Sequence, residues 1–349
     1  WGTGGALQGA GFSIPYPVYV FPNRRQRHRD VWINAGPQRA FRAPGHPQAC
    51  FVTEVVLDEL ADRLKLDPLE LRMRNLQPPD ASGVDQPNRQ WRKYFPMAAE
   101  KIGWSKRHPP GDATAGPIKR GLGCAANIWA GAGNPKTLAS CEILPDGSVT
   151  MRIGTQDIGT GTRTLVTMIP AETMGLPLDG VKVAIGDTNY PFAPGSGGSI
   201  TVGSVSPVVR VAAEGARNAL FAKVAAKLAG DDVATLVARD GRVSVRDDAS
   251  KSMTWRDACK LLGTEPINFQ GTWEKGLSDV GTSGVQFADV EVDIETGVTK
   301  VKKMVCVQDA GMFVDRLTAQ SQCIGGINMG LGFAHYEHRI LDRNTAQMV

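Results

Sequence analysis

The stretch from residue 38 to residue 48 reads Gln38-Arg39-Ala40-Phe41-Arg42-Ala43-Pro44-Gly45-His46-Pro47-Gln48, and a helical pattern follows it directly. Glycine lets a backbone approach a ligand closely, and the free N–H groups at a helix N-terminus favour negative charge. An arginine adds a fork of donors that suits phosphate or oxo oxygens. Taken by itself, the stretch therefore predicts a capped loop before a helix, with an anion-holding site as the alternative.

Length and composition limit the class of protein. The chain has 349 residues, which is long enough for two domains at about 100–200 residues each. With 42% hydrophobic and 21% charged residues it is globular rather than disordered. A net charge of +4 is too small to indicate a nucleic-acid partner, and the basic cluster at residues 24–29 predicts a solvated turn. No apolar stretch of about 18 residues predicts a membrane span.

The cysteines and histidines do not indicate a metal site. The six cysteines lack Cys-x-x-Cys spacing and fit neither a zinc nor an iron–sulfur pattern, which favours buried reduced thiols. His335 and His338 lack the i,i+4 spacing that a helical metal pair uses. We therefore expect no protein-ligated metal.

Outward from the opening stretch, apolar residues recur at helical spacing between residues 48 and 64. The helix predicted there would bury Val52, Val55, Val56, Leu60 and Leu64. A second helix is predicted from Pro68 to Met73, because Asp67 is a suitable N-cap and Pro68 suits the first helical position. Further expectations are a strand at 31–33, a polar loop at 79–92 and a domain boundary in the linker 109–117.

An internal repeat follows. Residues 140–153 predict a hairpin with a glycine turn, followed by a glycine loop at 154–161 and a helix at 165–174. Residues 287–307 predict a second hairpin, followed by a loop at 309–311 and a helix at 320–333. Helical patterns at 205–228 and 232–238 lie between the copies. The repeat predicts a pseudo-symmetric α+β domain with both loops directed to one place.

Three glycine-rich segments could carry chemistry. Residues 154–161 stand between a strand and a helix, which suits either an anion or a tight structural turn. Residues 194–204 are small and hydroxyl-bearing and lead into an apolar helix, again an anion cradle. Residues 320–332 place four glycines in a helical stretch, where each destabilises the helix by about 1 kcal/mol relative to alanine. Glycines kept at such a cost suggest the close approach of a backbone or ligand.

These four runs resemble, in the same order, the motifs of the molybdenum-cofactor subunit of the xanthine dehydrogenase/aldehyde oxidase family. The first resembles Phe-Arg-Gly-(Phe/Tyr/Ala)-Gly-x-Pro-Gln, and residues 320–332 resemble Gln-x-x-Gly-(Gly/Ala)-x-x-x-Gly-(Leu/Ile)-Gly. The resemblance implies an α+β fold with two molybdopterin-binding-type domains. Residues 1–110 would end the first domain, and 117–349 would form the second without its C-terminal end.

The resemblance also implies which residues bind the cofactor. Arg42 would act electrostatically near the metal, and Gln322 would hydrogen-bond the pterin. Molybdenum would be held by the dithiolene of the pterin rather than by protein side chains. The expected contacts are Phe41, Arg42, Ala43, Gln156, Asp157, Ile158, Gly159, Thr160, Gly161, Gly197, Gly198, Ser199, Ile200, Thr201, Val202, Gly203, Ser204 and Gln322.

The implied activity is hydroxylation of an aldehyde or N-heterocycle with water as oxygen source. The implied cofactor is molybdopterin, in its cytosine dinucleotide form if the chain is bacterial. Electrons would pass to 2Fe–2S clusters and FAD on partner subunits. Pro44 stands where purine oxidases carry an aromatic clamp, which favours an aldehyde substrate.

Several positions depart from the family pattern. Thr160 stands where many members have Gln, and neither the early glycine loop nor the late Gly-x-Gly-Glu motif is found. We therefore expect the general-base glutamate outside this chain, either because the chain is a fragment of a longer subunit or because another chain completes the subunit. We assign that role to neither Glu54 nor Glu337. Glu54 is expected to be a surface or structural carboxylate. The alternative is a catalytically silent, truncated paralogue that serves as a scaffold.

The start of the chain gives no targeting information. It begins at Trp1 rather than Met, so the natural N-terminus is expected to lie elsewhere. The compartment, cytoplasm or periplasm, is left open.

Overall fold

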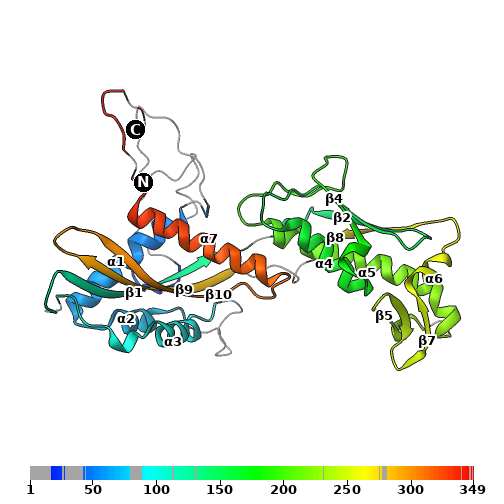
Figure 1. Ribbon diagram of the computed structural model, residues 1–349, viewed down its shortest axis with the longest axis horizontal. Coiled ribbons are helices and arrows are strands. Elements are labelled where there is room, and N and C mark those ends of the chain that lie inside the picture. The colour runs from blue at the N-terminus through cyan, green and yellow to red at the C-terminus, as the bar shows by residue number, and fades with distance from the viewer. Residues whose placement is uncertain are drawn as a thin grey trace. The chain divides into compact units, whose positions relative to one another are not determined.

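The protein is described here by a computed structural model. It describes residues 17–25, 27, 42–43, 45–78, 89–111, 114–129, 131, 133–230, 232–274, 276, 281–338, 340–345, 347 and 349. The chain divides into two compact units (Figure 1). Unit 1 comprises Trp1–Ala130, Gly281–Gly311 and Gln320–Val349, and unit 2 comprises Gly131–Val280 and Met312–Ala319. The fold class is α+β, as expected.

Unit 1 is built on a three-stranded antiparallel sheet in the order β1-β9-β10. Its elements are α1 (His46–Leu64), α2 (Pro68–Asn75), α3 (Trp91–Ile102), the 3-10 turn η1 (Trp104–Lys106), β1 (Ile118–Trp129), β9 (Thr282–Asp293), β10 (Thr299–Asp309) and most of α7 (Arg316–His335). The pairing of β1 with β9 runs from Ile118 opposite Asp293 to Trp129 opposite Thr282. The central strand of the unit is therefore supplied from a distant part of the chain.

Aromatic rings form the centre of the unit 1 core, where α3 and η1 pack on the sheet. The ring of Phe287, on β9, meets Phe95 edge-on at a centroid distance of 6.1 Å and Trp104 at 5.3 Å. Edge-to-face pairs at such distances add about 0.5–1.5 kcal/mol beyond the area they bury. These contacts fix α3 and η1 to β9.

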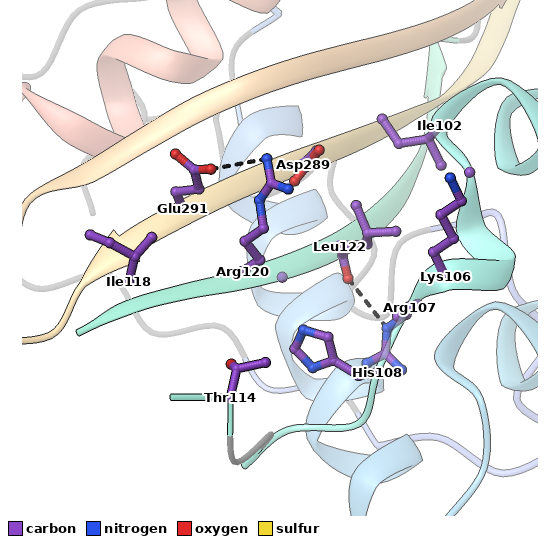
Figure 2. Close-up of a pocket in the computed structure, with 12 residues that line it drawn as sticks. Ile102, Lys106, Arg107, His108, Thr114, Ile118, Arg120, Leu122, Asp289 and Glu291 are labelled. Atoms are coloured by element: carbon purple, nitrogen blue, oxygen red, sulfur yellow. Dashed lines mark hydrogen bonds and ion pairs between the residues drawn. The ribbon is translucent and has the colours of Figure 1, made fainter. Parts of the chain in front are cut away.

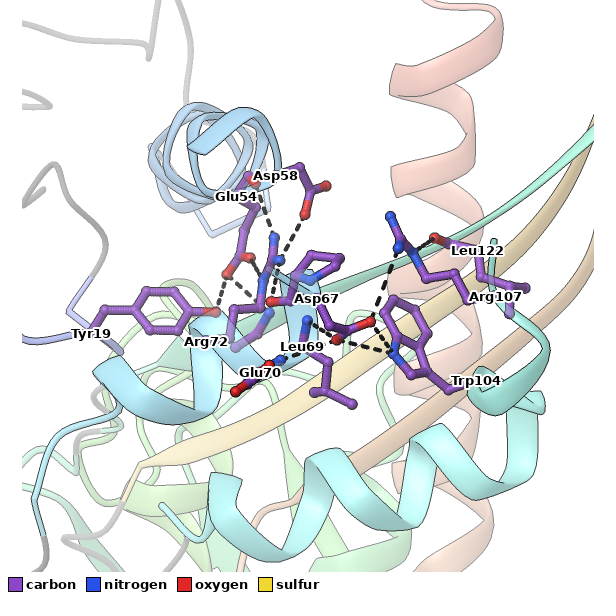
Figure 3. Close-up of polar contacts among 12 residues, drawn as sticks. Tyr19, Glu54, Asp58, Asp67, Leu69, Glu70, Arg72, Trp104, Arg107 and Leu122 are labelled. Atoms are coloured by element: carbon purple, nitrogen blue, oxygen red, sulfur yellow. Dashed lines mark hydrogen bonds and ion pairs between the residues drawn. The ribbon is translucent and has the colours of Figure 1, made fainter. Parts of the chain in front are cut away.

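A buried polar network joins α1, α2 and the N-terminal segment of unit 1 (Figure 3). The Glu54 carboxylate accepts from Arg72 Nε at 2.7 Å, from Tyr19 Oη at 2.8 Å and from the Ala126 N–H at 3.0 Å. Arg72 is fully buried and also donates to Asp58 at 2.7 Å. Burial raises the pKa of Glu54, against the opposing effects of Arg72 and the hydrogen-bond donors. Of the two roles expected for Glu54, the structure supports the structural one.

Unit 2 contains two sheets. Its elements are β2 (Leu138–Ile143), β3 (Val149–Ile153), α4 (Thr162–Met174), η2 (Leu178–Gly180), β4 (Val181–Ile185), α5 (Thr201–Leu228), η3 (Val233–Thr235), β5 (Leu236–Arg239), β6 (Arg242–Val245), β7 (Asp248–Thr254), α6 (Trp255–Lys260) and β8 (Ile267–Thr272). The larger sheet has the order β4-β3-β2-β8, with only β3 and β4 parallel. The smaller sheet has the order β5-β6-β7, and α4 and α5 pack together against the larger one.

Helix α5 lies unusually close to strand β8, because glycines remove the side chains between them. A Cβ built on Gly271 would stand 2.4 Å from the Val208 carbonyl oxygen and 2.6 Å from the Ala212 nitrogen. A Cβ built on Gly215, on α5, would stand 2.2 Å from the Phe269 ring. Both distances are below contact, so the position of α5 on the sheet depends on these two glycines.

The prediction for the buried face of α1 is wrong. The helix forms, but it buries Ala49, Thr53, Glu54, Leu57 and Ala61. Val52, Val55, Val56, Leu60 and Leu64 are exposed, from 38% for Leu60 to 55% for Val56. The physical reason is the Glu54–Arg72 pair, which allows a charged residue to face inward and turns the valine-rich face outward.

Other local predictions have mixed outcomes. The short second helix is confirmed as α2, with Asp67 Oδ1 accepting from the N–H groups of Leu69 and Glu70. Both hairpins are confirmed, as β2–β3 and β9–β10, each followed by a loop and a helix. The helix expected at 232–238 is wrong, because η3 and β5 occupy that segment. Helix α3 was not predicted, although its buried residues recur at helical spacing: Trp91, Tyr94, Phe95, Ala98, Ala99 and Ile102.

Some expectations differ from the structure in organisation. The two hairpin copies lie in different sheets and different compact units rather than in one domain. The domain boundary expected at 109–117 stays a prediction. The two compact units instead divide after Ala130, Val280, Gly311 and Ala319. The strand expected at 31–33 and most of the loop expected at 79–92 lie outside the described residues.

Candidate cofactor site

In unit 1 the structure brings together Arg42 and Gln322, two residues 280 positions apart that were both expected at the site. Arg42 Nη2 donates to the Gln322 side-chain oxygen at 3.0 Å and to its backbone oxygen at 2.9 Å. Arg42 Nη1 lies 3.7 Å from the sulfur of Met329. The amide oxygen of Gln322 therefore faces Arg42, which leaves the NH₂ group of the amide as a donor for another partner.

Local backbone geometry places Arg42 at the start of α1. Ala43 has φ +54° and Gly45, the N-cap, has φ +78°, so the chain turns sharply after Arg42. The left-handed region is unfavourable for alanine by about 1–2 kcal/mol. Phe41 and Pro44, on either side, lie outside the described residues.

The Arg42 side chain lies beside Gly325 and Gly326 of helix α7. A Cβ on Gly325 would stand 3.4 Å from Arg42 Nη1, and one on Gly326 would stand 3.8 Å away. Both distances are ordinary van der Waals contacts, so the expectation that glycines in 320–332 permit a close approach stays a prediction for these two positions. The approaching group is an arginine side chain from the same unit.

In unit 2 the loop 154–161 connects β3 to α4, as expected, and some backbone N–H groups around the start of α4 are already engaged. The Asp157 carboxylate accepts from the N–H groups of Gly159 at 2.9 Å, Gly161 at 3.3 Å and Arg163 at 2.9 Å. These backbone hydrogen bonds, that from Arg163 foremost, lower the pKa of Asp157. Of the two alternatives for this segment, an anion site and a tight structural turn, these contacts favour the turn.

Gln156 joins this loop to the second glycine-rich segment. Its Oε1 accepts from the Ser196 N–H at 2.9 Å, and its backbone oxygen accepts from Ser196 Oγ at 3.0 Å. Its Nε2 donates back to the Gly154 oxygen at 3.1 Å. The structure thus brings the segments 154–161 and 194–204 together at one point.

The start of α5, at Thr201, differs from the start of α4. Its N-cap residue is Ile200, and no side chain caps it. Ser199, just before it, has φ +57°, a strained conformation for a non-glycine residue. By contrast, the Ser204 hydroxyl is buried and bonded to the Ile200 oxygen and the Asn134 N–H, and the Gly203 oxygen accepts from Trp273.

Exposure separates the expected contacts of unit 2 into two groups. The exposed residues are Gln156, Asp157, Ile158, Gly159, Thr160, Gly197, Gly198, Ser199 and Val202. The half-buried residues are Gly161, Ile200, Thr201 and Gly203. The apolar side chain of Ile158, in the loop 154–161, is 67% exposed. Residue Thr155, which the sequence did not single out, has a buried hydroxyl without a hydrogen-bond partner among the described residues.

A concavity of unit 1 lies away from Arg42 and Gln322 (Figure 2). It has a volume of about 470 Å³, and its charged lining residues are Lys106, Arg107, Arg120, Asp289 and Glu291. Arg120 pairs with Glu291 at 2.9 Å, and Arg107 donates to the Leu122 oxygen. None of the expected site residues lines this concavity.

Sequence reasoning missed three features of the site: Met329 beside Arg42, the orphaned hydroxyl of Thr155, and the inward-facing role of Asp157. An Asp a few residues before a glycine-rich helix start could have signalled the last, because such side chains commonly accept from first-turn N–H groups.

The described part of the chain has neither a membrane-spanning helix nor a cluster of side chains that could hold a metal ion. None of its helices is long and apolar enough to cross a membrane. No group of three or more His, Cys, Asp or Glu side chains with assigned positions is arranged to hold a metal ion. All six cysteines are free, with Cys124, Cys141 and Cys259 buried.

Comparison with known proteins gives matches along nearly the whole chain. Two family models, both described as molybdopterin cofactor-binding domain, match residues 3–76 and 97–349. The aldehyde oxidoreductase molybdenum-binding subunit PaoC of Escherichia coli (strain K12) is 30% identical over 339 residues, covering 95% of this chain and 45% of that protein. The putative xanthine dehydrogenase molybdenum-binding subunit XdhA of the same strain is 27% identical, covering 94% and 46%. The chain spans about half the length of these relatives.

Solved structures match as well. Quinoline 2-oxidoreductase from Pseudomonas putida 86 aligns with a TM-score of 0.75 at 21% identity, covering 90% of this chain and 43% of that one, a likeness of fold. The aldehyde oxidoreductase from Desulfovibrio desulfuricans ATCC 27774 aligns with a TM-score of 0.64 at 26% identity, covering 85% and 32%.

Proposed function

Because this chain belongs to the molybdopterin cofactor-binding family, that of the molybdenum-binding large subunits of xanthine dehydrogenase and aldehyde oxidase type, we propose that it is the cofactor-binding part of a molybdenum hydroxylase. The enzyme oxidises an aldehyde or N-heterocycle with water as oxygen source. The observation that carries the proposal is the contact of Arg42 with Gln322, which joins two separate motifs of the family in one place. The family matches favour this function over a silent scaffold.

The residues present fit a large, polar, anionic cofactor. In unit 1, a guanidinium and an oriented amide supply donors at Arg42 and Gln322. In unit 2, α5 begins without a side-chain cap, and the hydroxyl of Thr155 is buried without a partner among the described residues. Open space around Gly195 and Gly197 would admit a ligand beside the backbone.

Each residue has a defined task in this proposal. Arg42 places positive charge where the cofactor carries oxygen and sulfur, and Gln322 donates its NH₂ group to a pterin acceptor. The first turn of α5 offers uncapped N–H groups, with the hydroxyls of Ser199 and Thr201, to the phosphate end. When bound, the molybdenum cofactor supplies a metal centre that accepts the two electrons of the oxidation. Phe41, Ala43 and the exposed residues 158–160 remain proposed contacts.

The substrate we favour is an aldehyde. Pro44 cannot stack on a purine as an aromatic clamp would, and the relative with 30% identity bears an aldehyde oxidoreductase name. Partner subunits with 2Fe–2S clusters and FAD would take the electrons, and a further polypeptide segment would supply the general base. The cytosine dinucleotide form of the cofactor is part of the proposal for a bacterial source.

The test is to purify the chain, with the subunits that accompany it, from a host that makes the cofactor. Molybdenum is measured by mass spectrometry and the oxidised pterin by fluorescence. We expect near-stoichiometric amounts of both, and a roughly 5- to 10-fold lower content in Arg42→Lys, the equivalent of about 1–1.4 kcal/mol. Arg74→Lys is the matched control, because Arg74 is exposed and pairs with Glu70 on the surface of α2. A folded wild-type sample with neither signal would refute the proposal.

A further inference from the structure

We propose that Asp157 is a positioning residue rather than a cofactor ligand, because its carboxylate serves as a built-in anion at the N-terminus of α4. The inference rests on the proposed function and deepens it, since it says which parts of the loop 154–161 are left to meet the cofactor. It reverses the direct contact that the resemblance implied for this side chain.

The first step is the set of contacts that Asp157 makes. One carboxylate oxygen accepts from the N–H groups of Gly159 and Gly161, and the other accepts from the Arg163 N–H, the second residue of α4. The N-cap of α4 is Gly161, which has no side chain of its own to offer. The negative charge that a helix N-terminus favours therefore comes from a residue four positions before the cap.

The second step is that the loop has the shape these contacts need. Gly159 and Gly161 have φ of +96° and +85°, which only glycine adopts without strain. A Cβ on Gly161 would stand 2.8 Å from Thr318 Cγ2, so the base of the loop is closely packed. The crest is open, because nothing lies within 4 Å of a Cβ built on Gly159.

The third step concerns Gln156, whose polar atoms are engaged with Ser196 and Gly154. With Gln156 and Asp157 both occupied inside unit 2, the parts of the loop that remain for a ligand are Ile158, Gly159 and Thr160. The phosphate end of the cofactor is excluded from α4, because it would have to displace the Asp157 carboxylate and then lie beside it. The uncapped start of α5 has no such competitor among the described side chains.

The experiment removes the built-in anion and offers a substitute. Asp157→Gly vacates the N-terminus of α4, and thermal unfolding is followed in inorganic phosphate and in chloride at matched ionic strength. We expect Tm in chloride to fall by about 2–6 °C, as for the loss of one helix cap in a unit of this size. Phosphate stabilises folded proteins in general, so both Tm values should rise. The rise in the variant should exceed the rise in wild type by at least half of the loss measured in chloride.

Asp157→Asn is the milder variant, because it keeps one oxygen acceptor and loses the charge. Its molybdenum and pterin content should fall severalfold. Asp146→Asn is the matched control, since Asp146 accepts from the Ser148 N–H at 2.8 Å in the β2–β3 turn of the same unit. It should keep the wild-type content and respond to phosphate as the wild type does.

The outcomes separate this inference from the proposed function. Equal stabilisation of wild type and Asp157→Gly by phosphate would overturn the inference, because the N-terminus of α4 would then be open in the natural protein. No phosphate response in the variant would overturn it too. A wild type without cofactor would refute the proposed function, and the phosphate comparison would still decide the role of Asp157.

Discussion

Arg72 donates from Nε to Glu54 Oε2 across 2.7 Å inside unit 1, and the Arg72 side chain is fully buried. Arg72→Met leaves the Glu54 carboxylate buried without its counter-charge. We expect the free energy of unfolding to fall by about 3–5 kcal/mol, the usual loss when one partner of a buried pair is removed. Denaturant unfolding of the variant against wild type measures this loss.

Arg74→Met supplies the comparison for Arg72. Arg74 pairs with Glu70 one helical turn away, and both side chains are exposed. Its loss should change the free energy of unfolding by no more than about 0.5 kcal/mol. Similar effects for the two variants would contradict a structural role for the buried pair.

The hydrogen bond of Tyr94 should make the stability of the protein depend on pH in the alkaline range. Its hydroxyl donates to Asp309 Oδ2 at 2.5 Å, and burial, together with this hydrogen bond, raises the pKa of Tyr94. The folded pKa lies above the unfolded value of about 10. The contribution of Tyr94 is therefore complete below about pH 10 and is lost as pH rises from there through the folded pKa.

Unfolding midpoints measured from about pH 8 to pH 11 test this expectation for Tyr94→Phe. The variant should be less stable than wild type at pH 8, and the gap should narrow as pH rises. Tyr190→Phe is the control, because Tyr190 is only half-buried in a loop of unit 2. A constant gap for Tyr94→Phe across this range would show that the hydroxyl does not titrate with folding.

Gly271→Ala tests the close packing of α5 on β8. The added methyl group would meet the Val208 oxygen at 2.4 Å and the Ala212 nitrogen at 2.6 Å, and neither backbone atom can move away cheaply. We expect a loss of about 1–3 kcal/mol or more, as for other overpacked cores. Gly123→Ala on β1 has nothing within 4 Å, and its change should be much smaller. Equal thermal shifts for the two variants would be inconsistent with the packing described here.

Local patterns in the sequence predicted much of the fold. Both hairpins depend on alternation around a glycine turn, and α2 depends on Asp67 and Pro68, so neighbouring residues carry the information. The orientation of α1 depends instead on Arg72, 18 positions after Glu54, and no periodicity in α1 reveals that partner. Hydropathy therefore selected the exposed face as the buried one.

The candidate site depended on the resemblance more than on the physics of single segments. Arg42 and Gln322 lie 280 positions apart, and nothing in either segment alone places them in contact. For the start of α4, the sequence left an anion site and a tight structural turn open, and the contacts of Asp157 in the structure favour the turn. Backbone N–H groups need hydrogen-bond partners, so the side chains of the loop itself are the first candidates before a ligand is considered.

The strand order of unit 1 has a consequence for how the chain is made. Strand β1 ends at Trp129, and its partner β9 begins only at Thr282, about 150 residues later. A ribosome that adds about 5–20 residues per second needs roughly 10–30 s to cover that distance. During this time the backbone N–H and C=O groups of β1 lack their β9 partner, while almost all of unit 2 is synthesised. Unit 2 can thus fold during synthesis, whereas unit 1 must be kept from aggregating until its central strand has emerged.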